Sequence, residues 1–214
     1  MAIVVIGGHS RNIGKTGIVC SLISAMPERR WTAIKITQCK HEAGSTNGEP
    51  CECEITGQAI AISEEGDSTT GTDSSRYLAA GAARSLWVRT LQDQLAEAMP
   101  RIRAIIASEE NVIIESNSIL RYLKPDVYAS VLDPQVSDFK ASALRYLDRA
   151  DAVLQSGNAA RGVGWAEGYL RLIERIPKFQ IAPPAYDSAD FASFVAQRIG
   201  QLDEKFPAPS WPII

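Results

Sequence analysis

The chain has 214 residues, of which 45% are hydrophobic and 22% are charged, a composition that fits a folded globular domain and excludes an intrinsically disordered chain. Because 25 acidic residues outnumber 22 basic ones, for a net charge of -3, there is no sequence-wide positive field, and we expect no nucleic acid partner. The longest apolar run, residues 1–6, is far shorter than the ~18 residues that cross a bilayer, so we expect no membrane partner and a cytoplasmic protein.

Strands alternate with helices along the whole chain. Hydrophobic patterns predict strands at residues 2–6, 32–37, 85–88, 111–115, 127–132, 152–154 and 179–182. They predict helices at 15–26, 73–80, 91–108, 137–149, 165–175 and 188–202, the third bent or started afresh at Pro100. This alternation predicts a single α/β domain over residues 1–214, with helices on both faces of a mainly parallel sheet of about seven strands.

Two segments stand outside this alternation. Residues 38–72 are rich in Gly, Ser, Thr, Glu and Cys, and a stretch this long without strong structure suggests a functional loop or a mobile switch, in which 55–62 has room for a short helix. Residues 204–214 contain three prolines and predict an extended tail, lying on the surface or on a neighbouring subunit.

A phosphate-binding loop is predicted where the first strand passes into the first helix. Gly8 is followed by five residues and then by Gly14-Lys15-Thr16. Backbone N–H groups and the helix dipole would surround a β-phosphate, Lys15 would reach the β and γ oxygens, and Thr16 would ligate Mg²⁺. The residues expected at the nucleotide are Gly8, His9, Ser10, Arg11, Asn12, Ile13, Gly14, Lys15, Thr16 and Gly17. His9 is equally well interpreted as a loop histidine hydrogen-bonded to the backbone.

The base of the nucleotide stays open between ATP and GTP. The sequence has no Asn-Lys-x-Asp guanine-reading motif. Asn158 follows the predicted strand at 152–154 and could offer both a donor and an acceptor to a purine, so we expect base contacts there.

The five-residue spacing of the Gly8–Thr16 segment resembles the loop of dethiobiotin synthetases and related amidoligases, in the dimer-forming (SIMIBI-like) branch of P-loop NTPases. This resemblance implies a three-layer P-loop NTPase fold and a homodimer. It also implies that Lys35 works near phosphate and substrate and that Glu115 coordinates Mg²⁺, which makes Lys15, Lys35 and Glu115 the candidate catalytic residues. Where the branch's deviant form has a signature lysine, this chain has Ser10, with Arg11 beside it. From the residues alone, Lys35 also fits an edge-facing strand lysine, and Glu115 a strand-end carboxylate.

Residues 73–82 resemble the Asp-Ser-x-Arg-His-x-x-Ala-Gly-Ala segment of molybdopterin-guanine dinucleotide biosynthesis protein B, a family of small GTP-binding accessory proteins. The chain departs from that family at Tyr77, which replaces His, and at Ser116-Asn117, which follow Glu115 where the family has Gly. Without the resemblance, Asp73 is equally well explained as a helix N-cap.

A cluster of metal-ligating residue types lies in the long segment. Cys39, His41, Cys51 and Cys53 would make a tetrahedral Zn²⁺ site or an iron-sulfur site, and the alternative is a loop with incidental cysteines. The Cys39-x-His41 spacing also resembles the motif of nickel-delivery GTPases for urease and hydrogenase, which implies that nucleotide state controls metal affinity.

These motifs together predict an Mg²⁺-dependent P-loop NTPase that acts as an accessory protein in cofactor or metal-centre assembly, with a metalloenzyme or an assembly factor as its partner. One alternative is a ligase resembling dethiobiotin synthetase, in which the γ-phosphate passes to a substrate carboxylate held by Lys35. The other is a nucleotide-gated metal carrier with slow hydrolysis. The sequence identifies neither the second substrate nor the pathway.

Overall fold

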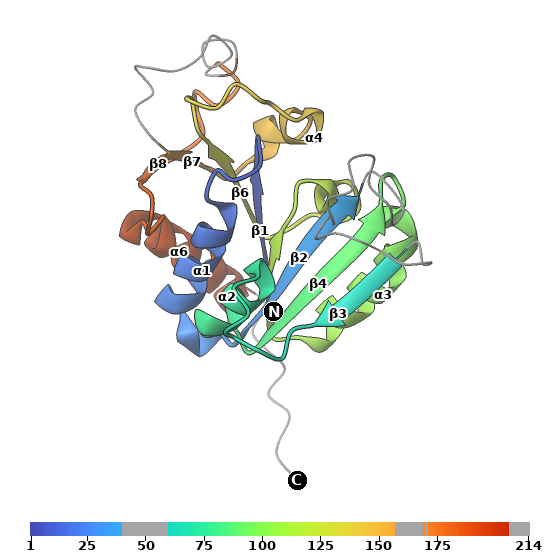
Figure 1. The fold of residues 1–214 in the computed structure, drawn as a ribbon. Helices are drawn as coiled ribbons and strands as arrows, with labels where there is room; N and C mark the ends of the chain where they lie inside the picture. Colours follow the sequence, from blue (N-terminus) through green and yellow to red (C-terminus); the bar gives the residue numbers. More distant parts are fainter. Residues whose placement is uncertain (40–59, 157–168, 170, 206–214) are drawn as a thin grey trace.

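The computed structural model describes residues 1–39, 60–156, 169 and 171–205, and within them the chain forms one eight-stranded α/β sheet (Figure 1). The strand order is β3-β4-β2-β5-β1-β6-β7-β8, and every neighbouring pair is parallel except β3 with β4. The strands are β1 (Ala2–Gly8), β2 (Trp31–Cys39), β3 (Ile60–Glu64), β4 (Arg84–Leu91), β5 (Asn111–Glu115), β6 (Val127–Leu132), β7 (Ala152–Ser156) and β8 (Lys178–Ile181). The predicted mainly parallel α/β fold is confirmed, with one strand more than expected.

Helices cover both faces of this sheet. They are α1 (Lys15–Ala25), α2 (Asp73–Ala79), α3 (Leu95–Ser108), α4 (Ala141–Leu144) and α6 (Ala189–Lys205), with short 3₁₀ turns at η1 (Pro27–Arg29), η2 (Ser118–Arg121) and η3 (Leu147–Arg149). Figure 1 shows α1, α2 and α6 on one face and α3 on the other. Successive β1 side chains serve opposite faces: Val4 and Ile6 pack with α1 and α6, and Val5 packs with α3. None of the helices described is long and apolar enough to span a membrane.

The extra strand corrects the prediction of a short helix at 55–62, of which only residues 60–62 are described. Ile60 and Ile62 pack on the α3 side of the sheet, while Ala61 and Ser63 alternate with them along the strand. The strand is antiparallel to β4, with Ile62 opposite Val88. Five residues of period-two alternation beside a polar tract are too few to distinguish a strand from a helix in sequence.

Three predicted helices differ from the structure. Residues 91–108 do not form one helix, because β4 runs through Leu91 and α3 starts at Leu95 and continues through Pro100 without a new start. Residues 137–149 form only α4 and η3, and residues 171–175 form turns. The remaining part of 165–175, apart from Tyr169, lies outside the described residues, as do 40–59 and 206–214.

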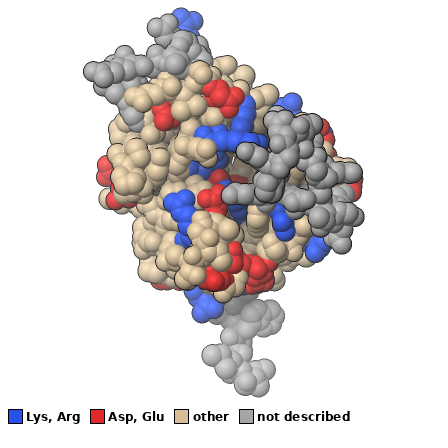
Figure 2. All heavy atoms as spheres, viewed as in Figure 1, with Lys and Arg blue, Asp and Glu red and all other residues tan. Residues whose placement is uncertain are grey.

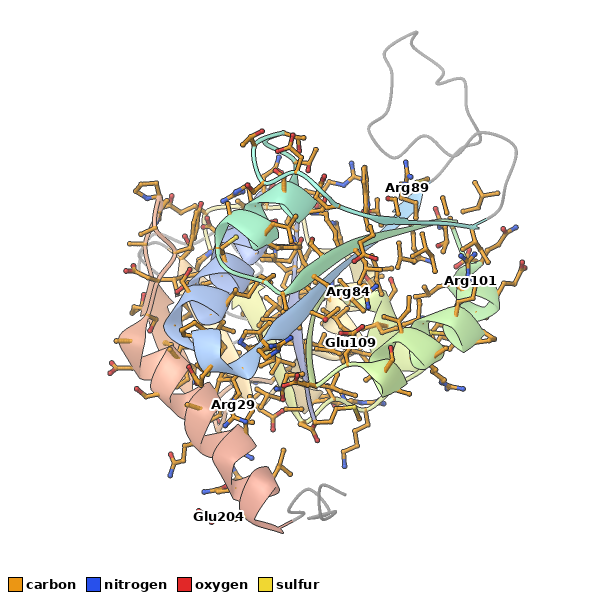
Figure 3. All side chains as sticks on the ribbon, turned by 90° about the horizontal axis from the view of Figure 1, so that it is seen from below. Arg29, Arg84, Arg89, Arg101, Glu109 and Glu204 are labelled. Carbon is orange, nitrogen blue, oxygen red and sulfur yellow. The ribbon has the colours of Figure 1, made fainter. Side chains whose placement is uncertain are left out.

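The amino-terminal edge of the sheet is closed by ion pairs. Arg84, at the start of β4, pairs with Glu64 at 2.7 Å and with Glu109, whose other oxygen accepts the Thr32 hydroxyl at 2.6 Å. Figure 3 shows Arg84 and Glu109 side by side beneath the sheet. Ligands of open α/β sheets bind at the opposite edge, beyond the carboxyl ends of the strands.

Candidate functional site

The loop that joins β1 to α1 makes a tight turn directly before the helix. Gly14 adopts φ +93°, and α1 begins at the next residue. A Cβ on Gly8 would lie 2.9 Å from the Ile13 side chain and 3.1 Å from the Val131 carbonyl oxygen. Glycine is therefore required at both ends of the loop, at Gly14 by conformation and at Gly8 by space.

Lys15 spans this loop. Its Nζ donates to the backbone carbonyl of Ser10 at 2.7 Å, so the ammonium lies inside the turn rather than in solvent. Burial lowers the pKa of Lys15, whereas the carboxylate of Glu115 acts in the opposite direction. Lys15 is therefore a partly desolvated cation that donates to a backbone carbonyl oxygen of the loop.

Three further predicted residues, Thr16, Lys35 and Glu115, lie together at the end of β5. The Thr16 hydroxyl donates to Oε2 of Glu115 at 2.7 Å, and Lys35, the register partner of Glu115 on β2, has its Nζ 3.4 Å from Oε1. Glu115 is only 7% exposed. The four residues expected to carry the chemistry, Lys15, Thr16, Lys35 and Glu115, thus lie together, and Figure 2 shows basic and acidic side chains meeting at the centre of this face.

Asp73, on the first turn of α2, adds a second carboxylate beside Lys35. Its carboxylate pairs with Lys35 and lies 3.7 Å from Arg76. Burial opposes the charge of both partners, but Glu115 and Asp73 together raise the pKa of Lys35, and Lys35 lowers the pKa of Asp73. Lys35 is therefore a protonated ammonium between two carboxylates. Asp73 is not the N-cap of α2, because Thr72 is the N-cap and its side chain accepts from the Ser75 N–H.

His9 is used by the backbone. The side chain is fully buried, its Nδ1 hydrogen-bonds the Asp138 carbonyl at 2.7 Å, and its Nε2 accepts from the Asp133 N–H at 3.0 Å. Because Nε2 is an acceptor, Nδ1 carries the proton and the ring is neutral, in keeping with a pKa lowered by burial. The structure therefore shows His9 as a loop histidine hydrogen-bonded to the backbone, the second of its two interpretations.

Asn117, two residues after Glu115, binds the start of the phosphate loop. Its Oδ1 accepts from the Gly8 N–H at 2.9 Å, and its Nδ2 donates to the Gly8 carbonyl at 2.8 Å. Sequence reasoning noticed Asn117 only as a departure from a family pattern and gave it no role. Its position, two residues after a predicted strand that ends at the site, is the sequence feature from which a role for Asn117 could have been predicted.

Lys140 was also missed. Its backbone N–H donates to the His9 carbonyl at 2.8 Å, which fixes the residue to the phosphate loop, and Ser10 holds the same segment through a 2.8 Å hydrogen bond to Asp138. Burial, together with the positive charges of Lys15 and Arg11, lowers the pKa of Lys140 to about 8, against smaller opposing effects of Asp138 and Glu115.

We expect the titration of Lys140 to appear in nucleotide binding. Its folded-state pKa of about 8 lies below its ordinary value, so between pH 7 and 9 the residue changes from cation to neutral amine, and affinity for an anion falls. Isothermal titration of MgATP should show weaker binding at pH 9 than at pH 7, and a shallower pH dependence in Lys140→Gln. If Lys140→Gln has the same pH dependence of MgATP affinity as wild type, the dependence is due to Lys15, which both proteins retain.

The segment after β8 packs against the other end of the loop. A Cβ on Gly14 would lie 2.2 Å from the Tyr186 ring, and one on Gly17 would lie 2.8 Å from it. The Tyr186 N–H donates to the Ala182 carbonyl at 2.8 Å. Gly17 thus allows close packing at the start of α1.

Four of the predicted site residues lie outside the described residues: Asn158, His41, Cys51 and Cys53. Cys39 is described, as the buried last residue of β2. Among the residues that are described, His, Cys, Asp and Glu side chains form no group of three or more that could hold a metal ion.

No protein-family model matches the chain, and no curated protein matches it. Solved structures do. HypB from Helicobacter pylori in complex with nickel is 12% identical, with a TM-score of 0.47, over 97% of this chain and 90% of that one. LpxK from Aquifex aeolicus in complex with ATP is 16% identical, with a TM-score of 0.46, over 84% of this chain and 53% of that one.

MobB from Bacillus subtilis is 14% identical, with a TM-score of 0.41, over 92% of this chain and 98% of that one. All three TM-scores are below 0.5, so we base the functional proposal on the geometry of the site itself.

Proposed function

We propose that the chain binds a nucleoside triphosphate with Mg²⁺ at the Gly8–Thr16 loop and hydrolyses it, as a P-loop NTPase. The observation that carries this proposal is the hydrogen bond from Thr16 to Glu115 beside Lys15. A hydroxyl has one proton and two lone pairs. Because Thr16 gives its proton to the carboxylate, its lone pairs remain available for a hard cation.

The donor set fits Mg²⁺, which prefers oxygen ligands and keeps several waters. Thr16 and Glu115 would hold the ion, with the carboxylate of Asp73 nearby, on the far side of Lys35. When bound, Mg²⁺ would neutralise charge that develops on the phosphate oxygens. We further propose that Lys15 exchanges the Ser10 carbonyl for phosphate, and that Lys35 contributes its fixed positive charge on the γ-phosphate side.

From the sequence resemblances, we also propose an accessory role in cofactor or metal-centre assembly. The protein would act as a homodimer, and its partner would be a metalloenzyme or an assembly factor. The ligase alternative would require Lys35 to bind a substrate carboxylate, whereas the structure pairs it with Asp73 and Glu115. These two ion pairs of Lys35 favour hydrolysis over carboxylate activation.

A nucleotide screen tests the function. We expect ATP or GTP, with Mg²⁺, to raise the melting temperature of the purified protein, with AMP and ADP less effective, because only a triphosphate reaches both Lys15 and the Glu115 end of the site. Inorganic phosphate should be released slowly in the absence of any second substrate. A protein stabilised by neither triphosphate at millimolar concentration would contradict the proposal.

Metal analysis tests the cysteine prediction separately. We expect about one zinc per chain, or an iron-sulfur chromophore in protein isolated without oxygen, and its loss when Cys51 and Cys53 are both changed to Ser, because hydroxyls replace two soft thiolates. Cys20→Ser is the matched control, since Cys20 lies on α1 and contacts the Arg76 carbonyl. If wild-type protein contains no metal, Cys39, His41, Cys51 and Cys53 do not form a metal site.

A further inference from the structure

Tyr77 reaches the candidate metal carboxylate from a fully buried position. It is 0% exposed on α2, and its hydroxyl donates to Oε2 of Glu115. Thr16 donates to the same oxygen at 2.7 Å. Since an sp² carboxylate oxygen offers two in-plane lone pairs, these two hydroxyls fill Oε2.

The other oxygen of Glu115 is in a different situation. Oε1 faces the ammonium of Lys35 at 3.4 Å, a distance longer than a strong charge-assisted hydrogen bond. Lys35 is held more closely by Asp73. The two oxygens of one carboxylate are therefore distinct: Oε2 accepts from two neutral donors, and Oε1 faces a cation that lies farther away and is held mainly by Asp73.

One short helix creates this arrangement. Asp73 and Tyr77 are four residues apart on α2, so both side chains lie on the same helical face. That face supplies a carboxylate to Lys35 and a phenol to Glu115. The start of the helix is fixed by Thr72, whose hydroxyl donates to Glu65 at 3.1 Å.

We propose that Tyr77 is a positioning residue that locks the Glu115 carboxylate, so that Oε1 alone is presented to the Mg²⁺ ion and its waters. The inference rests on the proposed function, because it assigns a role within that same site. A phenylalanine would fill the same volume, so packing alone requires only the aromatic ring. The hydroxyl is explained by its hydrogen bond to Glu115. Without it, Oε2 keeps only the Thr16 donor and the carboxylate is free to turn.

The test is Tyr77→Phe, with Tyr128→Phe as the matched control. Tyr128 is 2% exposed and packs on the opposite, α3 side of the sheet, with its ring beside Gly7, so its variant removes a second buried hydroxyl that lies near the loop but not on Glu115. For both variants, ATP and GTP affinities are measured in EDTA and then across a Mg²⁺ titration. We expect Tyr77→Phe to bind nucleotide in EDTA within twofold of wild type and to need about tenfold more Mg²⁺ for half-maximal enhancement. Tyr128→Phe should match wild type in both measurements.

Each other outcome has a definite meaning. Equal weakening with and without Mg²⁺, an unchanged Mg²⁺ requirement, or the same shift in Tyr128→Phe would overturn the role of Tyr77 while nucleotide binding stands. Wild-type protein that binds neither triphosphate would instead overturn the proposed function.

A second measurement keeps the inference testable if Tyr77→Phe does not fold. In wild-type protein labelled with ¹³Cζ-tyrosine and already saturated with nucleotide in EDTA, a tyrosine resonance should shift when Mg²⁺ is then added in excess, because its acceptor gains a dication. The same resonance should stay in place in Glu115→Gln. If no tyrosine signal responds to Mg²⁺ in a protein that binds the nucleotide, Tyr77 does not position the carboxylate.

Discussion

Replacing Lys15 by Ala should weaken ATP or GTP binding by roughly ten- to a hundredfold or more, because one charge-assisted hydrogen bond to phosphate is worth about 1.5 to 3 kcal/mol and more where water is excluded. The lost group is the Nζ that spans the loop to Ser10. The measurement is nucleotide affinity by titration calorimetry, together with thermal stabilisation by each triphosphate.

The fold itself should survive the loss of Lys15. Burial lowers the pKa of Lys15, so the folded state gains little from retaining this charge. Lys124→Ala is the matched control, since Lys124 is exposed and precedes β6 at the opposite edge of the sheet. Equal nucleotide affinity in wild type and Lys15→Ala would remove the phosphate-loop interpretation.

The site residues that sequence could predict are those whose spacing is fixed by one strand, turn or helix. The Gly8-to-Thr16 segment is a local motif, and Lys35 and Glu115 follow from parallel strands that end at the same sheet edge, where the structure makes them register partners. A strand pattern fixes which edge a residue occupies. It therefore predicts a neighbourhood, although not the hydrogen bonds within it.

The rest of the site depends on contacts between distant segments. Tyr77 meets Glu115, and Asn117 meets Gly8, only because α2 packs on α1 and β5 lies beside β1. Lys140 joins the loop through a backbone hydrogen bond, which no side-chain pattern encodes. The same reason applies to β3, whose pairing with β4 supplies the structure that its short alternation could not signal.

Glu115→Gln should retain nucleotide and lower hydrolysis by about a hundredfold, because a neutral amide replaces the carboxylate that a dication and the developing phosphate charge require. The amide oxygen can still accept from Thr16 and Tyr77, and Lys35 keeps its partner Asp73, so the fold should be retained. The amide NH₂ then faces the Lys35 ammonium, donor against donor, so we expect a somewhat lower melting temperature than wild type. Phosphate release under saturating Mg²⁺ and nucleotide measures the effect.

The control for Glu115→Gln is Glu97→Gln, the same change at an exposed position on α3, across the sheet from the site. It should hydrolyse at the wild-type rate. The two variants differ only in whether the lost charge faces Thr16 and Lys35, so a difference between them reports the position of Glu115 rather than a change in net charge. If Glu115→Gln turns over nucleotide as fast as Glu97→Gln, then Glu115 serves only to bind Thr16, Tyr77 and Lys35 within the folded chain.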